Sequence, residues 1–327
     1  MEFYSRITIP QSSFSFSYNE QTILLGSCFV ENIGKKLEEN KFPIDLNPFG
    51  ILYNPSSIAH AIRLLIYPTE FKGEELFQKG GIYHSFYHHS RFSSSSESEC
   101  LRKINEQLAL SAQHLRTANR MIITFGTAWV YHLKETGEIV SNCHKLPEKL
   151  FHRRRLSVQE IIDTWQTLLG ELWEVNPEIK ILFTVSPIRH WKDGAHPNQL
   201  SKSTLLLAIE ELQQSHPDQI AYFPSYEIMM DELRDYRFYA DDLFHPSAQA
   251  IEYIWERFHE SMFSKETLSI IREWEEIQKA IQHKPFHPQS EAYKRFISQT
   301  LLKIEIFKKK FPFFDITKET EEIKQKI

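Results

Sequence analysis

Two short motifs, far apart in the sequence, contain the residue types that acyl transfer to serine requires. Gly26-Ser27-Cys28-Phe29 places a hydroxyl between the apolar run of residues 22–25 and a helical pattern. Asp242-Leu243-Phe244-His245 offers a carboxylate and an imidazole three residues apart. A serine needs an adjacent base to attack an ester, and the base needs a group that orients it. Ser27, His245 and Asp242 are therefore the candidate nucleophile, base and supporting carboxylate.

Each motif also has a purely structural interpretation. Serine before a helix is a common N-cap, and Pro246 and Ser247 beside Asp242 are typical of a helix start. Cys28 is the better intrinsic nucleophile, but free cysteine is usually buried, so we interpret it as a packing residue. The order of the two motifs, with strands and helices between them, favours the catalytic interpretation.

Less specific candidates complete the site. Gly50, in Asn47-Pro48-Phe49-Gly50, could give a backbone N–H to an oxyanion hole, although a turn also explains this glycine. A side-chain donor could come from Thr127 or Asn142. The expected substrate-binding residues are His88, His89, His144 and Arg189.

The histidines and cysteines of the chain also raise the question of a metal. Cys143 and His144 with His84, His88 and His89 show no metal-ligand spacing, so we expect neither metal nor cofactor. The basic run Arg153-Arg154-Arg155 is expected to be a solvated face, with binding of an anionic substrate group as the alternative.

Strands and helices alternate along most of the chain. Buried strands are predicted at residues 21–26, 41–46, 121–125, 179–185 and 219–223, with a hairpin at 129–133 and 138–141. Helices are predicted at residues 28–40, 55–66, 97–115, 157–173, 199–214 and 248–263. This alternation predicts a doubly wound, mostly parallel α/β sheet. Functional residues of such sheets lie beyond the carboxyl ends of the strands, where Ser27, Thr127 and Arg189 fall.

From about residue 265 the sequence becomes charged and helical, with helices predicted at 266–281 and 291–309. We therefore divide the chain into a core of residues 1–262 and a helical extension of residues 263–327 packed on it. Two helices alone bury too little apolar surface to fold independently.

The composition excludes several classes of protein. A net charge of −5 over 327 residues gives no reason to expect nucleic acid or a membrane surface as a partner. Residues 1–18 lack the apolar segment of a signal peptide, and no run approaches the roughly 20 apolar residues of a membrane span. The three cysteines are expected to be free thiols in a reducing compartment. We expect a cytoplasmic protein.

Taken together, these blocks resemble the GSCFA family, a branch of the SGNH (GDSL-like) hydrolase superfamily. The motif reads Gly26-Ser27-Cys28-Phe29-Val30, with valine for the final alanine, and the blocks at 47–50, 125–127, 142–145, 186–189 and 242–247 also resemble the family, over roughly residues 20–262. The resemblance implies a three-layer α/β/α hydrolase with Ser27 as nucleophile, His245 as base and Asp242 as its support.

The resemblance also implies an oxyanion hole built from the Ser27 N–H, a glycine that Gly50 matches, and an asparagine. Ala128 stands at the asparagine position, so Asn142 or Thr127 would have to replace it.

The function that these residues favour is a serine esterase that hydrolyses a small acyl ester through an acyl-enzyme. The substrate would be a small molecule or a carbohydrate, and an O-acetyl group on a sugar is one candidate. Two alternatives stay open: an acyltransferase with the same residues, and a non-catalytic ligand-binding module on the same fold. The acyl group, the alcohol and the oligomeric state stay open.

Overall fold

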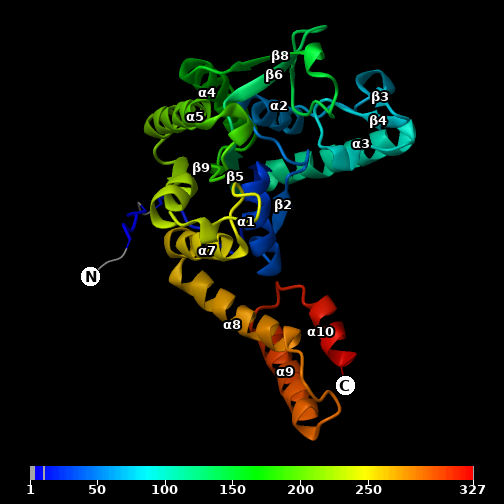
Figure 1. Ribbon diagram of the computed structural model, residues 1–327. Helices are drawn as coiled ribbons and strands as arrows, with labels where there is room; N and C mark the ends of the chain where they lie inside the picture. Colours follow the sequence, from blue (N-terminus) through cyan, green and yellow to red (C-terminus); the bar gives the residue numbers. More distant parts are fainter. Residues whose placement is uncertain (1–3, 10–11, 327) are drawn as a thin grey trace.

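The computed structural model describes residues 4–9 and 12–326, and a five-stranded sheet lies at its centre (Figure 1). The strands are β1 (Thr22–Gly26), β2 (Ile44–Leu46), β5 (Arg120–Phe125), β9 (Lys180–Val185) and β10 (Ile220–Phe223). Their order is β10-β9-β5-β1-β2, and every neighbouring pair is parallel. The chain thus winds outward in both directions from β1, which confirms the doubly wound sheet.

Alternating side chains of the strands enter two separate hydrophobic cores. Leu24, Ile122 and Leu182 belong to one core, whereas their neighbours Ile23, Ile123 and Phe183 belong to the other. Successive side chains of a strand point to opposite faces, so an apolar run with both sets buried must be covered by helices on both sides.

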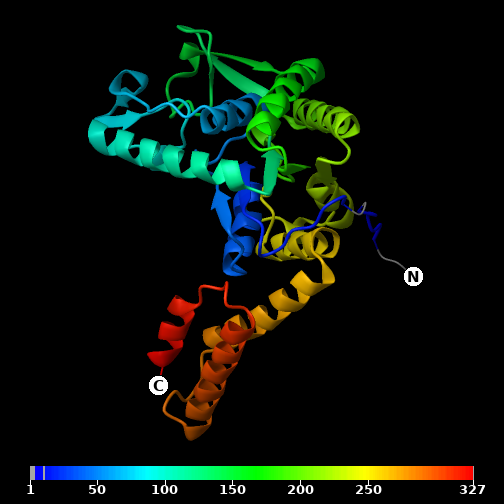
Figure 2. The same cartoon turned by 180° about the vertical axis from the view of Figure 1, so that it is seen from behind.

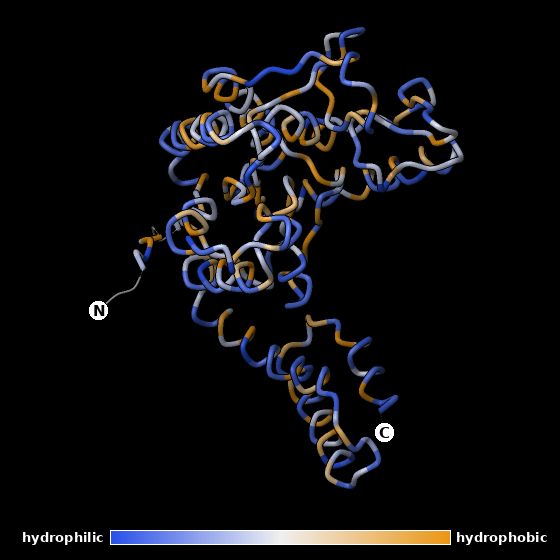
Figure 3. Tube along the Cα trace, in the orientation of Figure 1, coloured by the Kyte–Doolittle hydropathy of each residue, from blue (hydrophilic) through white to orange (hydrophobic). Residues whose placement is uncertain are grey.

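Six long helices supply this cover. One face carries α2 (Pro55–Ile66), α3 (Glu97–Thr117), α4 (Val158–Val175) and α5 (Ala195–Ser215), and the other carries α1 (Cys28–Glu39) and α7 (Ala248–Met262). Figures 1 and 2 show the two groups on opposite sides of the sheet. In Figure 3 apolar residues follow the central strands and polar residues follow the outer loops. The molecule is a three-layer α/β/α sandwich, and no helix in residues 4–9 and 12–326 is long and apolar enough to cross a membrane.

Two small antiparallel sheets lie outside these layers. The hairpin of β3 (Phe77–Lys79) and β4 (Ile82–His84) is one, and β6 (Trp129–Leu133), β7 (Ile139–Val140) and β8 (Phe151–Arg155) form the other in the order β7-β6-β8. The predicted hairpin β6–β7 is confirmed. The basic run Arg153-Arg154-Arg155 belongs to β8, which pairs with β6 with Tyr131 opposite Arg153, and its three arginines are partly exposed. Short helical turns connect these elements: Gly73–Glu75, Ser90–Phe92, Glu148–Leu150, Trp191–Asp193, α6 (Ser225–Glu227), Ile228–Glu232 and Tyr236–Phe238.

The extension consists of α8 (Lys265–Gln282), α9 (Glu291–Lys310) and α10 (Thr317–Lys324), of which only α10 was not expected. Figures 1 and 2 show α8 and α9 projecting away from the sheet. Trp274 and Gln278 of α8 both donate hydrogen bonds to the carbonyl of Glu39, at 2.8 and 2.6 Å, where α1 ends. The apolar core on the α1 side continues into the extension. The division of the chain at residue 262 stays a prediction.

Candidate active site

A cavity of about 510 Å³ lies at the carboxyl ends of three parallel strands. Ser27 follows β1, Thr127 comes two residues after β5, and Ser186 follows β9; all three line this cavity. His245, from the loop before α7, lines it as well. We call it the Ser27 cavity. Ligands of doubly wound sheets bind at such a point, where the winding direction reverses.

Ser27 sits in a turn that only a glycine before it allows. Gly26 has a φ of +143°, and a Cβ there would lie 2.3 Å from the carbonyl oxygen of Thr124 in β5. Ser27 is the N-cap of α1, and its hydroxyl oxygen accepts a 3.4 Å hydrogen bond from the N–H of Phe29. This bond uses an oxygen lone pair and leaves the hydroxyl proton for a base. The capping and the catalytic interpretations of Ser27 are therefore compatible.

Asp242 orients His245 through three hydrogen bonds. One carboxylate oxygen accepts the ring Nδ1–H at 2.5 Å, and the other accepts the backbone N–H groups of Phe244 and His245 at 2.9 Å each. These bonds, above all the one from the His245 backbone, hold the pKa of Asp242 at about 2. The carboxylate is thus ionised at neutral pH, and the proton on Nδ1 leaves Nε2 with the free lone pair of a general base.

The serine and the histidine line the same cavity without touching each other. No hydrogen bond joins the Ser27 hydroxyl to His245 in the described part of the chain. The His245 side chain is about half exposed, while Ser27 is buried. Catalytic hydrogen bonds are often long without substrate and tighten when it binds. The two residues are brought together at one site, and their catalytic roles stay predictions.

Two of the backbone donors implied for the oxyanion hole are engaged within the fold. The Ser27 N–H donates to the carbonyl of Thr124 at 3.3 Å, and the Gly50 N–H donates to that of Asn47 at 2.6 Å. Gly50 does not line the Ser27 cavity; it has a φ of +78°, and a Cβ there would lie 2.2 Å from the Cβ of His89. The structure therefore places Gly50 in a turn that packs on His89 and outside the lining of the cavity.

Thr127 and Asn142 both line the cavity, but they differ in their free donors. The Thr127 hydroxyl shares a 3.1 Å hydrogen bond with that of Ser201 and accepts one from the Trp129 N–H. The amide oxygen of Asn142 accepts the N–H of His144 at 2.8 Å, so its NH₂ group is the half left for a ligand. Of the two candidates, Asn142 is the better donor.

The four expected substrate-binding residues divide into two pairs. Arg189 and His89 line the Ser27 cavity. His88 and His144 do not, and both are buried. The His88 ring stacks on Phe49, and burial lowers its pKa to about 3. The His144 Nε2–H donates to a backbone carbonyl at 2.8 Å, and burial lowers its pKa to about 4. As neutral core residues, these two do not contact a ligand in the cavity, which corrects the prediction.

Arg153 belongs to the cavity, against expectation. Its guanidinium lies 4.3 Å from the ring centroid of Trp129 and 5.3 Å from that of Tyr131, and it pairs with the carboxylate of Asp193. The alternation of residues along β8 is the signal that could have placed it on the face of Tyr131.

His190 is a second lining residue to which sequence reasoning gave no role of its own. A Cβ on Gly126 would lie 3.4 Å from both the Ser27 Cβ and the His190 Nε2, so the serine and this ring flank the same glycine. Burial and then the nearby Lys202 lower the pKa of His190 to about 3. The imidazole of His190 is therefore uncharged at physiological pH and lines one side of the cavity.

Lys202 lies directly beneath the cavity and was missed entirely. It is fully buried in α5, and its ammonium donates to the carbonyls of Gly126 and Ser186 at 2.7 Å each. These carbonyls follow β5 and β9, so one side chain joins two strand ends that shape the cavity. Burial lowers the pKa of Lys202 to about 7. A lone lysine among the apolar residues of a helix is a weak signal of this kind of position.

Two of the three cysteines also line the cavity. Cys28 and Cys143 are partly exposed there, whereas Cys100 is buried, and all three are free thiols. The Cys28 sulfur lies 3.5 Å from the Tyr53 hydroxyl, so the expectation of a packing residue was too narrow. In residues 4–9 and 12–326, no group of three or more histidine, cysteine, aspartate or glutamate residues could hold a metal ion.

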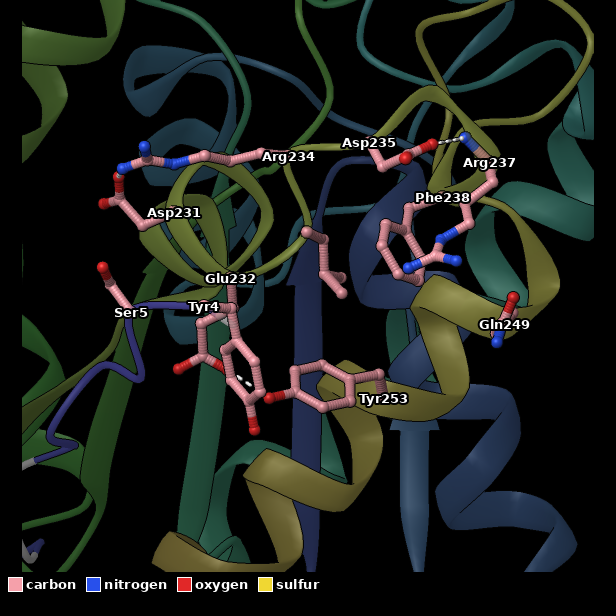
Figure 4. A pocket seen from close by; sticks show the side chains of 11 residues that line it. Tyr4, Ser5, Asp231, Glu232, Arg234, Asp235, Arg237, Phe238, Gln249 and Tyr253 are labelled. Carbon is pink, nitrogen blue, oxygen red and sulfur yellow. Dashed lines mark hydrogen bonds and ion pairs between the residues drawn. The ribbon is translucent and has the colours of Figure 1, made fainter. Parts of the chain in front are cut away.

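A larger cavity, of about 880 Å³, lies elsewhere, between residues 4–5, residues 231–238 and α7 (Figure 4). Its polar groups pair with one another: Arg234 with Asp231 at 2.9 Å, and the Tyr253 hydroxyl with Glu232. Among its lining residues there is no histidine to serve a serine as base. The Ser27 cavity, which is lined by both a serine and a histidine, is therefore the candidate active site.

These features define a class of protein: a three-layer α/β/α sandwich with Ser27, His245 and Asp242 at the switch point of its sheet. A sequence model of the GSCFA family matches residues 21–258, and one of the GSCFA domain protein, C-terminal domain, matches residues 274–327. The chain belongs to the GSCFA family.

Comparisons with other known proteins are more distant. No curated protein matches the chain in sequence. A carbohydrate esterase family 3 structure from Talaromyces cellulolyticus is 10% identical, with 77% of this chain and 98% of that chain covered and a TM-score of 0.35. The Clostridium thermocellum family 3 carbohydrate esterase is 11% identical over 77% and 97%, with a TM-score of 0.33. An acetyl xylan esterase from Butyrivibrio proteoclasticus is 10% identical over 75% and 64%, with a TM-score of 0.37.

Proposed function

We propose that this protein is a serine esterase that cleaves small acyl esters through an acyl-enzyme. One observation carries the proposal: Ser27 and His245, more than 200 residues apart, line one cavity, and Asp242 holds the histidine in the tautomer of a general base. An O-acetyl group on a carbohydrate is our candidate substrate. Free cysteines in the cavity suit a reducing compartment, and we propose a cytoplasmic location.

The reaction would follow two steps. His245 Nε2 takes the Ser27 proton as the serine oxygen attacks the ester carbon, and the imidazolium then gives that proton to the leaving alcohol. Water, activated by the same Nε2, hydrolyses the acyl-enzyme and restores the serine. The ionised Asp242 stabilises the imidazolium in both steps.

The developing oxyanion requires hydrogen-bond donors near Ser27. We propose the free NH₂ group of Asn142 and the backbone N–H of Cys28, the first of α1, which has no hydrogen-bond acceptor among the described residues. A helix N-terminus also favours negative charge. Removing one such donor typically costs about 100- to 1,000-fold in rate. The engaged N–H groups of Ser27 and Gly50 would make this hole smaller than the one that the resemblance implies.

The test of the nucleophile is Ser27→Ala, with Cys28→Ala as the matched control. We expect Ser27→Ala to lose at least about 1,000-fold in kcat/KM towards p-nitrophenyl acetate, because the substitution removes the hydroxyl that we propose as the nucleophile. Cys28→Ala should retain most of the activity. Circular dichroism checks that both variants fold. Turnover that is unchanged in Ser27→Ala and lost in Cys28→Ala would overturn the assignment.

A ligand-binding module on the same fold is the second candidate. It is favoured by the engaged N–H groups of Ser27 and Gly50, and by the missing hydrogen bond between Ser27 and His245. A fluorophosphonate probe separates the two, because it reacts with an activated serine only. An adduct mapped to Ser27 supports the esterase, and full recovery of unmodified protein supports the module. Product analysis with alcohol acceptors distinguishes hydrolysis from acyl transfer.

A further inference from the structure

The charges around the Ser27 cavity do not balance. Its charged lining residues are three cations, Arg153, Arg189 and Lys192, and one carboxylate, Asp193. Arg153 pairs with Asp193, and the exposed Lys192 pairs with Glu148 at 2.8 Å. Arg189 is in no ion pair with any residue that the structure describes.

The hydrogen-bonding groups of Arg189 are also poorly satisfied. Within the described residues, one terminal nitrogen contacts the thioether sulfur of Met230 at 3.3 Å, and the Nε is buried with no partner. A thioether is a weak acceptor, whereas a guanidinium has five donors in a fixed fork. Buried donors in proteins are nearly always paired, so these unpaired groups need an acceptor.

A second basic group, Lys202, lies close by and makes the same region more positive in its protonated form. Besides its burial, the nearby Arg189 lowers the pKa of Lys202. Lys202 is bound by two carbonyls rather than by a carboxylate. A concave site with uncompensated positive charge concentrates anions, and guanidinium groups bind carboxylate and phosphate in a bidentate manner.

We propose that the substrate of this site carries an anionic group, a carboxylate or a phosphate, which Arg189 binds. This inference rests on the proposed esterase function and narrows its substrate to charged esters. The anion neutralises Arg189 and accepts hydrogen bonds from its guanidinium. Arg189 is thus a specificity residue that discriminates charged from neutral substrates.

Two matched ester pairs test the proposal and show which side of the ester carries the charge. In the first pair, mono-4-nitrophenyl succinate carries a carboxylate on its acyl group and 4-nitrophenyl butyrate is its neutral counterpart. In the second pair, 3-acetoxybenzoate carries the carboxylate on its alcohol and 3-acetoxybenzamide is the neutral counterpart. We expect the wild type to prefer the charged member of at least one pair by about tenfold or more in kcat/KM. Arg189→Met should abolish that preference, so that the charged and the neutral member of the pair are cleaved with kcat/KM values within about twofold of each other.

Lys192→Met is the matched control, because it also removes a lining cation, but one that is exposed and already paired. It should retain the preference for the charged ester. Arg189→Lys keeps the positive charge but loses the bidentate geometry of the guanidinium, so it should retain only part of the preference for the charged ester. Equal rates on both members of both pairs, or a preference that survives in Arg189→Met, would overturn the proposal.

Binding to Ser27→Ala separates this inference from the proposed function. Calorimetric titration with 3-hydroxybenzoate, inorganic phosphate and succinate requires no turnover. We expect at least one of these anions to bind to Ser27→Ala, and at least tenfold more weakly once Arg189→Met is added. Anion binding without hydrolysis by the wild type would refute the esterase and leave the anion site standing. Ester hydrolysis by the wild type that does not depend on Arg189 would support the esterase and refute the anion site.

Discussion

Ser27 combines two tasks that are usually treated as alternatives. Its oxygen caps α1, and its proton stays available for the base that we propose, His245. A cap fixes the rotamer of the serine, so the entropy of positioning the hydroxyl is lost during folding and not during the reaction. Asp242 acts on the histidine in the same way, because two backbone N–H groups and the ring all bind one carboxylate.

Lys202 makes the stability of the protein depend on pH in a direction that can be predicted. Burial lowers its pKa to about 7 in the folded state, below the usual 10.5. Between these values the unfolded chain binds more protons than the folded one, so the contribution of Lys202 to stability rises from pH 7 to pH 10. Below pH 7 the lysine is charged in both states, and its contribution is flat.

Urea unfolding of the wild type and Lys202→Met across pH 6–10 measures this contribution as a difference. We expect the wild type to gain stability relative to the variant as pH rises through 7, and the difference to stay constant below it. The subtraction removes other titrating groups. A difference that does not change with pH would show that the lysine keeps an ordinary pKa among its two carbonyl partners.

At the scale of elements, the close approach of β1 and β5 decides where Ser27 lies. Gly26→Ala would place a Cβ 2.3 Å from a backbone oxygen of β5, in a region of φ that other residues avoid. We expect it to destabilise the fold by about 3 kcal/mol or more, from strain and overpacking together. Gly170→Ala is the control, because its Cβ in α4 meets nothing within 4 Å.

The control should gain about 0.5–1 kcal/mol, because alanine is the better helix former. Urea titration monitored by circular dichroism measures both variants. If Gly26→Ala were as stable as the wild type, then β1 and β5 would not pack as closely as described, and the turn that holds Ser27 would not depend on glycine.

Most elements could be predicted from the sequence, and the exceptions have physical reasons. The strands were found because both of their faces are apolar, as Ile23 and Leu24 illustrate. β8 was missed because three arginines in a row are typical of a solvated surface, whereas the partly exposed Arg153 pairs with the carboxylate of Asp193 and lies over the ring of Trp129.

The site was predicted less completely than the fold. Ser27, Asp242 and His245 belong to motifs with local spacing, so the sequence was sufficient to select them. His88 and His144 were placed in the pocket because the sequence does not show which rings close over them; Phe49 comes from another segment. Lys202 was not predicted because its partners are backbone carbonyls. Every residue has such a carbonyl, so the sequence gives no sign of which ones a lysine will bind.

At the scale of the molecule, the extension contacts α1 at the end opposite Ser27. Trp274 is fully buried, and its N–H satisfies a carbonyl that the end of a helix leaves unpaired. We expect Trp274→Phe to cost about 1–3 kcal/mol, from the lost hydrogen bond and the lost contacts. Leu302→Ala, on the exposed side of α9, should cost less than about 0.5 kcal/mol.

Amide hydrogen exchange measures which helices lose stability in Trp274→Phe. In Trp274→Phe the amides of the last turn of α1 should exchange faster than in the wild type, while those of α4 on the other face of the sheet should not change. Unchanged protection at the end of α1 would mean that the extension does not stabilise this helix.

Because α1 and α8 share one apolar core, a truncated chain that lacks the extension cannot be used to measure activity. A chain cut after α7 uncovers the apolar flank of the helix that begins at Ser27, together with the carbonyl of Glu39. Loss of turnover in such a fragment would be indistinguishable from partial unfolding. Activity measurements are therefore sound only on a chain that keeps residues 263–327, with point substitutions in place of truncations.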